Sequence, residues 1–379
     1  MQITPFTIDV PDADVRDLKA RLANTRWPAD VASDWSRGTP ASYARGLADR
    51  WANDFDWAAA QDRLNEFPQF TTTVDGQLYH FVHVRSAVPD ATPLLIAHGY
   101  PSSFVEFIRM IEPLVDPEAH GGRPEDAFHV VIPSLPGFGF STPATRPGLG
   151  IKGAAAAFDQ IMQGLGYERY GIHGGDVGAG IAEELSILAG DRITGSLVVT
   201  DPGAIATEYT PPTDHLTPEE QERLQTLKAA RVEDFGYLAL QTTRPQSIAY
   251  GLTDSPVMQL TWIVEKVREW TDPARELPDD AVDVDHLLTL VSVYWFGKGG
   301  AGAANFLYEA MHAEASWGRT HDRPQGFVSF GEEPLVRRVL DPNHERAYWN
   351  EHAEGGHFPA MEQPDLLVGD LRAFFATFR

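Results

Sequence analysis

Residues 170–185 combine a short apolar run, a glycine-rich turn and a helix-like segment in direct succession. The run Tyr170-Gly171-Ile172-His173 is typical of a buried strand, and the turn Gly174-Gly175-Asp176-Val177-Gly178 separates it from a helical pattern that begins at Ala179. A turn of this kind holds one side chain at the carboxyl end of a parallel sheet. That side chain is the carboxylate of Asp176, so the chain is predicted to form a parallel α/β sheet with an acid at its edge.

Three regions of different character surround this turn. Residues 1–85 are rich in tryptophan and predict an N-terminal segment that clasps a larger body; they end in two β-like runs joined by Asp75-Gly76, a strong hairpin signal. Residues 86–203 and 318–379 alternate β-like and helical segments, which predicts the sheet-forming core. Residues 204–317 lack β-like runs, and their position between strands predicts a helical lid.

The composition limits the partners of the protein. The formal net charge of −24 disfavours binding to nucleic acid and to anionic membrane surfaces, but it does not affect a neutral small molecule. The chain has no cysteine, which excludes disulfides and thiolate nucleophiles, and it has no apolar run long enough to span a membrane. We therefore expect a cytoplasmic enzyme with a small-molecule substrate. The oligomeric state stays open, with a homodimer as one option.

A second reactive group follows near the C-terminus. His357 lies in the loop Glu354-Gly355-Gly356-His357-Phe358-Pro359, after the last predicted strand. In α/β-hydrolases the order along the chain is nucleophile, acid and histidine, so Asp176 and His357 occupy the positions of a nucleophile and a general base. Attack by a carboxylate forms an ester at an alkyl carbon, and the histidine then activates water to hydrolyse that ester. This chemistry suits epoxides or alkyl halides.

Backbone N–H groups for an oxyanion are expected from two loops. His98-Gly99-Tyr100-Pro101 directly follows an apolar strand-like run that ends at Ala97. In an α/β-hydrolase this loop and the residue after the nucleophile supply the two donors. The expected donors are therefore the N–H groups of Tyr100 and Val177.

These motifs resemble those of epoxide hydrolases of the microsomal type. The matching segments are His98-Gly99-Tyr100-Pro101, Gly174-Gly175-Asp176-Val177-Gly178 and Gly355-Gly356-His357-Phe358-Pro359-Ala360, and the tryptophan-rich segment resembles the N-terminal domain of that family. The resemblance covers nearly the whole chain. We expect no membrane anchor like that of the mammalian members, so the chain is expected to be similar to soluble bacterial and fungal relatives. The resemblance implies an α/β-hydrolase fold with a helical lid, and conversion of an epoxide and water to a vicinal diol.

Further expectations come from the resemblance alone. Some bacterial relatives act in antibiotic biosynthesis on large aromatic epoxides, so a bulky aromatic epoxide of secondary metabolism is one candidate substrate. The family uses neither a metal nor an organic cofactor. Its members use two lid tyrosines to hydrogen-bond the epoxide oxygen. The first corresponds to Tyr237, whereas the second aligns with Leu307 and leaves the neighbouring Tyr308 as the candidate. Neighbouring positions on a helix point about 100° apart, so Tyr308 replaces the second tyrosine only if the helix shifts or rotates.

The acid that orients His357 has two candidates in the family pattern. Counting along the strand from Gly326 without gaps reaches Glu333, whereas counting backwards from His357 permits Glu332. We expect Glu333, because strand register fixes the direction of a side chain more reliably than loop length does.

Two rival functions use the same fold. Haloalkane dehalogenases share the aspartate and histidine, but they place tryptophan or arginine directly after the nucleophile, where this chain has Val177. An inactive scaffold that only binds a small molecule would be free to lose a catalytic group, yet candidates for nucleophile, base and acid are all present. Hydrolysis of an epoxide is therefore the function that we expect.

Overall fold

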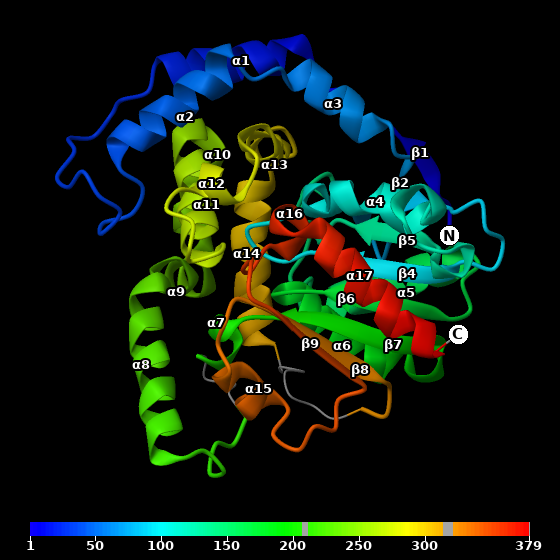
Figure 1. Ribbon diagram of the computed structural model, residues 1–379. Helices are drawn as coiled ribbons and strands as arrows, with labels where there is room; N and C mark the ends of the chain where they lie inside the picture. The colour runs from blue at the N-terminus through cyan, green and yellow to red at the C-terminus, as the bar shows by residue number, and fades with distance from the viewer. Residues whose placement is uncertain (207–210, 314–320, 379) are drawn as a thin grey trace.

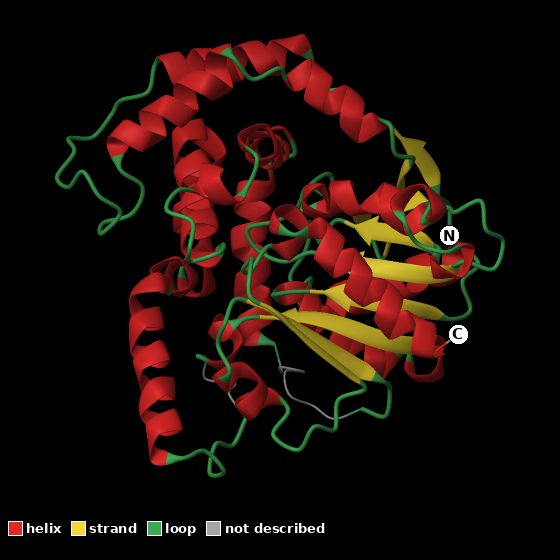
Figure 2. Ribbon diagram, in the orientation of Figure 1, coloured by secondary structure: helices red, strands yellow, loops and turns green. Residues whose placement is uncertain are grey.

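The computed structural model describes residues 1–206, 211–313 and 321–378, and a nine-stranded sheet lies at the centre of these residues (Figures 1 and 2). The order across the sheet is β1-β2-β3-β5-β4-β6-β7-β8-β9. The strands are β1 (Thr4–Phe6), β2 (Gln69–Val74), β3 (Gln77–Val84), β4 (Thr92–Ala97), β5 (Phe128–Pro133), β6 (Tyr170–Gly174), β7 (Ile193–Thr200), β8 (Gln325–Phe330) and β9 (Tyr348–His352). Strands β1, β2, β3 and β5 pair antiparallel in turn, and the pairs from β5 to β9 are parallel. The predicted mostly parallel sheet is confirmed.

Helices cover both faces of this sheet. One layer contains α4 (Ile108–Val115) and α17 (Pro364–Phe375), which pack on each other, and the opposite layer contains α5 (Ile151–Gly164) and α6 (Val177–Leu188) (Figures 1 and 2). The central strands β4, β5 and β6 are consequently buried on both sides. This burial explains why their sequences are continuous apolar runs and show no alternation.

The hairpin expected at Asp75-Gly76 joins β2 to β3. Both residues have positive φ angles, 48° and 80°, and Val74 pairs with Gln77 across the turn. Two successive positive φ values are the signature of the tight turn that matches the twist of the flanking strands. The hairpin prediction is confirmed.

The described part of the segment between β7 and β8 contains helices and connecting loops but no strand. Its helices are α7 (Pro202–Ile205), α8 (Pro218–Asp234), α9 (Gly236–Thr243), α10 (Pro245–Asp254), α11 (Pro256–Trp270), α12 (Pro278–Ala281), α13 (Val284–Phe296) and α14 (Gly299–His312). We call α8 to α14 the lid. The predicted boundary between residues 317 and 318 lies outside the described residues. None of the helices in the described ranges has both the length and the apolar character needed to cross a bilayer.

The N-terminal helices lie across the lid (Figure 1). They are α1 (Asp12–Ala23), α2 (Ala41–Asn53) and α3 (Trp57–Asn65), of which α1 and α2 pack on α11 and α3 packs on α13. The Nε1–H of buried Trp51 donates to the hydroxyl of Ser292 in α13 at 2.8 Å. Since β1, β2 and β3 from the same segment belong to the sheet, residues 1–85 connect the lid to the core.

Candidate active site

Asp176 occupies a strained turn between β6 and α6. Its φ and ψ angles are 51° and −126°, a combination that non-glycine residues rarely adopt. The turn also requires a close approach of the backbone, because a Cβ at Gly178 would lie 2.0 Å from the carbonyl oxygen of Ala97. The predicted strand, sharp turn and helix are confirmed, and together they hold the Asp176 carboxylate at the carboxyl edge of the sheet.

The loop after β4 lies against this carboxylate. The N–H of Tyr100 donates to Oδ1 of Asp176 at 2.9 Å. Gly99 leaves the space for this contact, because a Cβ there would lie 2.5 Å from Asp176 Oδ1. Val177 begins α6, where the first N–H groups have no partner within the helix. The two expected backbone donors therefore flank Asp176, and the one from Tyr100 contacts Oδ1.

His357 faces the other oxygen of the same carboxylate. Its Nε2 lies 3.7 Å from Oδ2 of Asp176, and its Nδ1 is hydrogen-bonded to Oδ2 of Asp201. Asp201 directly follows β7 and also accepts the N–H of Ala204, which caps the short helix α7. The imidazole of His357 thus lies between the carboxylates of Asp176 and Asp201, and we call these three side chains the relay. Asp201 fixes the orientation of the His357 ring.

The expectation that Glu333 orients His357 is wrong. Glu333 follows β8, but its Oε2 pairs with the guanidinium of Arg223 in α8 at 2.8 Å, and its Oε1 accepts the N–H of Leu335 at the start of α15 (Leu335–Leu340). The alternative, Glu332, is exposed. The loop after β8 turns its carboxylate toward the lid, whereas the loop after the neighbouring strand β7 directs Asp201 toward His357. The sequence contained one signal for this arrangement, an acid directly after a strand.

The charges of the relay change the protonation of its members. Burial alone would lower the pKa of His357, but the charge of Asp201, the hydrogen bond that His357 donates to Asp201 and the charge of Asp176 raise it above the ordinary value of 6.5. Burial alone would raise the pKa of Asp201, but the charge of His357 and the hydrogen bond to it hold that pKa below its ordinary range. Asp201 is therefore ionised whenever His357 is in a position to act as a base.

The His357 loop is fixed by contacts with the lid. The N–H of His357 donates to the carbonyl of Trp270 at 2.7 Å, and the two rings pack edge to face at 5.1 Å. The carboxylate of Glu362 accepts the N–H groups of Gly356 and Phe358, on either side of His357, and also that of Asp272 in the lid. The position of His357 is thereby fixed by backbone hydrogen bonds to the carbonyl of Trp270 and to the carboxylate of Glu362.

Tyr237 is the lid tyrosine that lies at the site. It belongs to α9, and its ring stacks on that of Tyr100 with a centroid distance of 5.5 Å. Burial, and next the nearby charge of Asp176, raise the pKa of Tyr237 well above its ordinary value. The phenol therefore keeps its proton near neutral pH and is a hydrogen-bond donor.

Tyr308 is not brought to the site. Its ring stacks on that of His312, one turn along the same helix, with a centroid distance of 4.0 Å, whereas Tyr237 stacks on Tyr100 beside Asp176. Leu307 is buried in the core at the preceding position. Neighbouring positions on a helix point about 100° apart, so the side chain of Tyr308 points away from the direction of Leu307.

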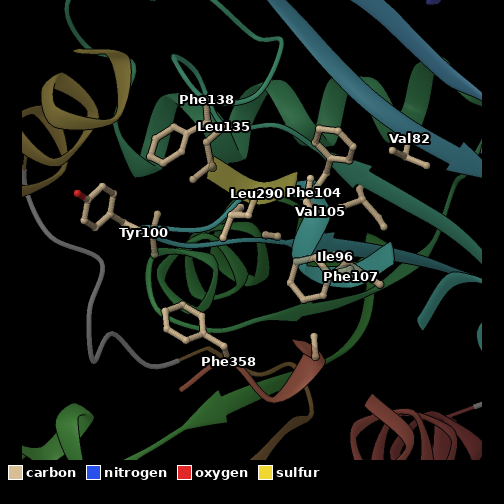
Figure 3. Close-up of a cluster of buried hydrophobic side chains, with 14 of the residues drawn as sticks. Val82, Ile96, Tyr100, Phe104, Val105, Phe107, Leu135, Phe138, Leu290 and Phe358 are labelled. Atoms are coloured by element: carbon tan, nitrogen blue, oxygen red, sulfur yellow. The ribbon is translucent and has the colours of Figure 1, made fainter. Parts of the chain in front are cut away.

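A small cavity lies beside Asp176 and His357. It is lined by His98, Gly99, Tyr100, Ser102, Glu106, Phe107, Gly175, Asp176, His357 and Phe358, and its volume is about 10 Å³. That volume corresponds to roughly one water molecule. Figure 3 shows the apolar neighbours Phe104, Val105 and Phe107 beside Ile96 of β4, with Tyr100 and Phe358 in the same view. This cavity therefore has no room for a group larger than water.

Comparison with known proteins gives a consistent result. Residues 3–107 match the family model for the epoxide hydrolase N terminus, and residues 92–249 match the model for the alpha/beta hydrolase fold. The chain is 41% identical to a putative epoxide hydrolase of Stigmatella aurantiaca, over 100% of this chain and 86% of that protein. It is 30% identical to epoxide hydrolase 1 of Sus scrofa, over 98% and 88% of the two chains. The chain belongs to the epoxide hydrolase family.

Solved structures of epoxide hydrolases also match over the whole chain. The juvenile hormone epoxide hydrolase of Bombyx mori superposes with a TM-score of 0.83 at 27% identity, covering 100% of this chain and 94% of the other. The epoxide hydrolase of Aspergillus niger gives the same TM-score at 28% identity, covering 100% and 97%. The α/β-hydrolase fold is confirmed, and neither the dehalogenase nor the binding-protein alternative is favoured.

Proposed function

We propose that this epoxide hydrolase opens its substrate in two steps, through an ester between Asp176 and an epoxide carbon. The observation that carries the proposal is the position of one carboxylate between two partners: Oδ1 accepts the N–H of Tyr100, and Oδ2 faces Nε2 of His357. A carboxylate is a nucleophile without prior deprotonation, so the histidine is free to serve the second step.

In the first step Oδ2 of Asp176 bonds to an epoxide carbon, and the bond from that carbon to the epoxide oxygen breaks. The phenol of Tyr237 donates a hydrogen bond to this oxygen and gives up its proton as the ring opens. Its pKa, raised by burial, is suited to a donor that stays protonated until an alkoxide forms. The products are a hydroxyalkyl ester and a tyrosinate.

In the second step Nε2 of His357 takes a proton from water, and the water oxygen bonds to the carboxyl carbon of Asp176. The resulting oxyanion is Oδ1, which the N–H groups of Tyr100 and Val177 stabilise. Collapse of this intermediate breaks the bond to the alkyl oxygen, which takes the proton from His357. The proton lost when Asp176 returns to a carboxylate restores the phenol of Tyr237. The net reaction consumes one water and one epoxide and produces one diol.

The ester intermediate is tested by a single turnover in ¹⁸O-labelled water with enzyme in excess over styrene oxide. We expect the label in Asp176 and an unlabelled diol, because the new diol oxygen comes from Oδ2. Mass spectrometry of the peptide that contains Asp176 and of the diol gives both values. Label in the diol alone after one turnover contradicts the proposal.

The substrate that we propose is an aromatic epoxide of secondary metabolism. Support comes from the rings of Tyr100, Tyr237 and Trp270, which pack on one another beside the reactive groups. Aromatic rings recognise flat apolar groups through offset or edge contacts. Values of kcat/KM for styrene oxide and a larger polycyclic epoxide, compared with those for short aliphatic epoxides, test this preference. A preference for the aliphatic compounds counts against it.

A further inference from the structure

The cavity beside Asp176 and His357 is also lined by an acid, Glu106, that neither proposed step uses. Glu106 belongs to the short 3-10 helix η1 (Phe104–Phe107), directly after the loop that carries Tyr100. Only 7% of the residue is exposed, and its neighbours Val105 and Phe107 are buried in the core (Figure 3). A carboxyl group is rarely placed in such surroundings without a partner or a function.

We propose that Glu106 is a positioning residue that holds the hydrolytic water against His357. This inference rests on the proposed two-step reaction and assigns its second step a further residue. The cavity has the volume of about one water, and Asp176, His357 and Glu106 all line it. A water there has two hydrogens, of which one is directed to Nε2 of His357 and the other to the carboxylate of Glu106. Its lone pair is then free to point at the carboxyl carbon of the ester.

The surroundings of Glu106 are consistent with this assignment. Burial raises its pKa to about 7, and the hydroxyl of Ser102 hydrogen-bonds the carboxyl group and partly opposes that effect. The charges of His357 and Asp176 also act on it, so the three groups share one electrostatic environment. When Asp176 is esterified its negative charge is removed, which favours the ionised form of Glu106 at the stage when water must be oriented.

The test separates the two chemical steps. Wild type and Glu106→Gln are mixed with styrene oxide in a rapid-quench apparatus, and intact-protein mass spectrometry follows the adduct on Asp176. Glutamine has nearly the same shape as glutamate, but it replaces the charged carboxylate, which only accepts hydrogen bonds, with a neutral amide. We expect the rate of adduct formation to stay within about twofold of wild type and adduct hydrolysis to slow at least tenfold, since water orientation matters only in the second step. The variant should therefore accumulate adduct.

Two further variants make the result specific. Glu112→Gln, at an exposed position of α4, is the matched control and should leave both rates unchanged. Glu106→Asp keeps the charge and should recover part of the hydrolysis rate that glutamine loses. If both Glu106 variants slow the two steps equally, or leave adduct hydrolysis unchanged, Glu106 does not position water. If wild type forms no adduct at all, the proposed ester mechanism fails first, so the two failures are distinguishable.

Discussion

At the scale of single residues, the chemistry depends on which carboxylate reaches His357. Two acids follow neighbouring strands of the sheet, Asp201 after β7 and Glu333 after β8, and only Asp201 is hydrogen-bonded to Nδ1. A buried carboxylate in this position selects the tautomer that leaves Nε2 free to accept a proton, and it stabilises the imidazolium that forms. Glu333 instead forms an ion pair with a guanidinium that is 57% exposed.

Substitution of each acid should give opposite results. Asp201→Asn should lower kcat by about 10²–10⁴-fold, as loss of the orienting acid does in other relays. Glu333→Gln should leave kcat within about threefold, because this carboxylate does not contact His357, and it should cost about 1 kcal/mol of stability, because the guanidinium of its partner Arg223 is largely exposed. Steady-state kinetics and thermal unfolding measure both effects. A large loss of kcat in Glu333→Gln with an active Asp201→Asn would reverse the assignment.

The protonation of His357 predicts the acid side of the pH profile. The imidazole must be neutral to accept a proton, and its pKa is raised above 6.5 by Asp201 and Asp176 against the effect of burial. In the ester intermediate Asp176 carries no charge, so Asp201 is the carboxylate that raises the pKa there, and the hydrolysis rate should fall about tenfold per pH unit below the pKa of His357 in that intermediate. Of the two carboxylates, Asp201 has the larger effect on the pKa of His357. Asp201→Asn removes its charge, so the fall in hydrolysis rate should begin at a lower pH. Glu333→Gln serves as the control and should leave the profile in place; an unchanged profile in Asp201→Asn contradicts the cause given for the shift.

At the scale of elements, two loops and a helix start must meet around one carboxylate. The turn between β6 and α6 carries Asp176, and the loop after β4 supplies the N–H of Tyr100. The backbones approach so closely that Gly99 and Gly178 have no room for a side chain. A strained φ at Asp176 persists because these contacts hold it.

Gly99→Ala tests this close approach. The added Cβ would lie 2.5 Å from Oδ1 of Asp176 and must displace the carboxylate. A displacement of about 1 Å costs on the order of 10²-fold in rate, so adduct formation should slow by about that factor. The control is Gly369→Ala in α17, where no heavy atom lies within 4 Å of the new Cβ. Normal rates of adduct formation in Gly99→Ala would show that the carboxylate tolerates the shift.

The His357 loop and the lid are joined through Glu362. Its carboxylate accepts the N–H groups of Gly356, Phe358 and Asp272, so Glu362→Ala leaves three backbone donors without their partner. Each buried donor left unpaired costs about 1–3 kcal/mol. We expect a lower unfolding temperature and a lower kcat, whereas Glu362→Gln, which keeps one acceptor oxygen, should lose less of each. Equal losses in the two variants would indicate that the charge matters more than the acceptor.

At the scale of the whole molecule, the N-terminal segment connects the lid to the sheet. Its helices α1, α2 and α3 pack on α11 and α13, and its three strands extend the sheet at the edge beyond β5. The lid in turn contributes Tyr237 and the contacts of Trp270 with the His357 loop. The position of the Tyr237 phenol, the proposed proton donor, therefore depends on packing far from Asp176.

The buried hydrogen bond between Trp51 and Ser292 can be used to measure how strongly the N-terminal segment and the lid are coupled. Trp51→Phe and Ser292→Ala each remove one partner of the hydrogen bond, and each should destabilise the protein by about 1–2 kcal/mol. The double variant should be less destabilised than the sum of the two, because one interaction is lost only once. Chemical denaturation of the four proteins gives the coupling energy. Strict additivity would show that the bond does not couple the helices.

Much of this architecture follows from local sequence. The apolar runs of β4, β5 and β6, the Asp75-Gly76 hairpin and the turn around Asp176 are each determined by a few neighbouring residues, through side-chain periodicity and backbone sterics. The order of motifs along the chain also places Asp176 and His357 at the same sheet edge, because parallel strands end there together.

Contacts between distant segments decided the rest. Asp201 and Glu333 follow adjacent parallel strands, and nothing in either loop specifies which of them turns toward His357. Tyr308 lies one residue from the position that faces the site, and only the packing of α14 fixes that rotation. Glu106 and Glu362 gave no signal in the sequence, since a buried carboxylate and an exposed one have the same neighbours along the chain. The sequence alone therefore located Asp176 and His357, the proposed nucleophile and base, whose positions are set by short-range backbone geometry. The tertiary structure decided the orienting acid and the lining of the water cavity, because those depend on loops that meet only after the sheet and the lid have packed.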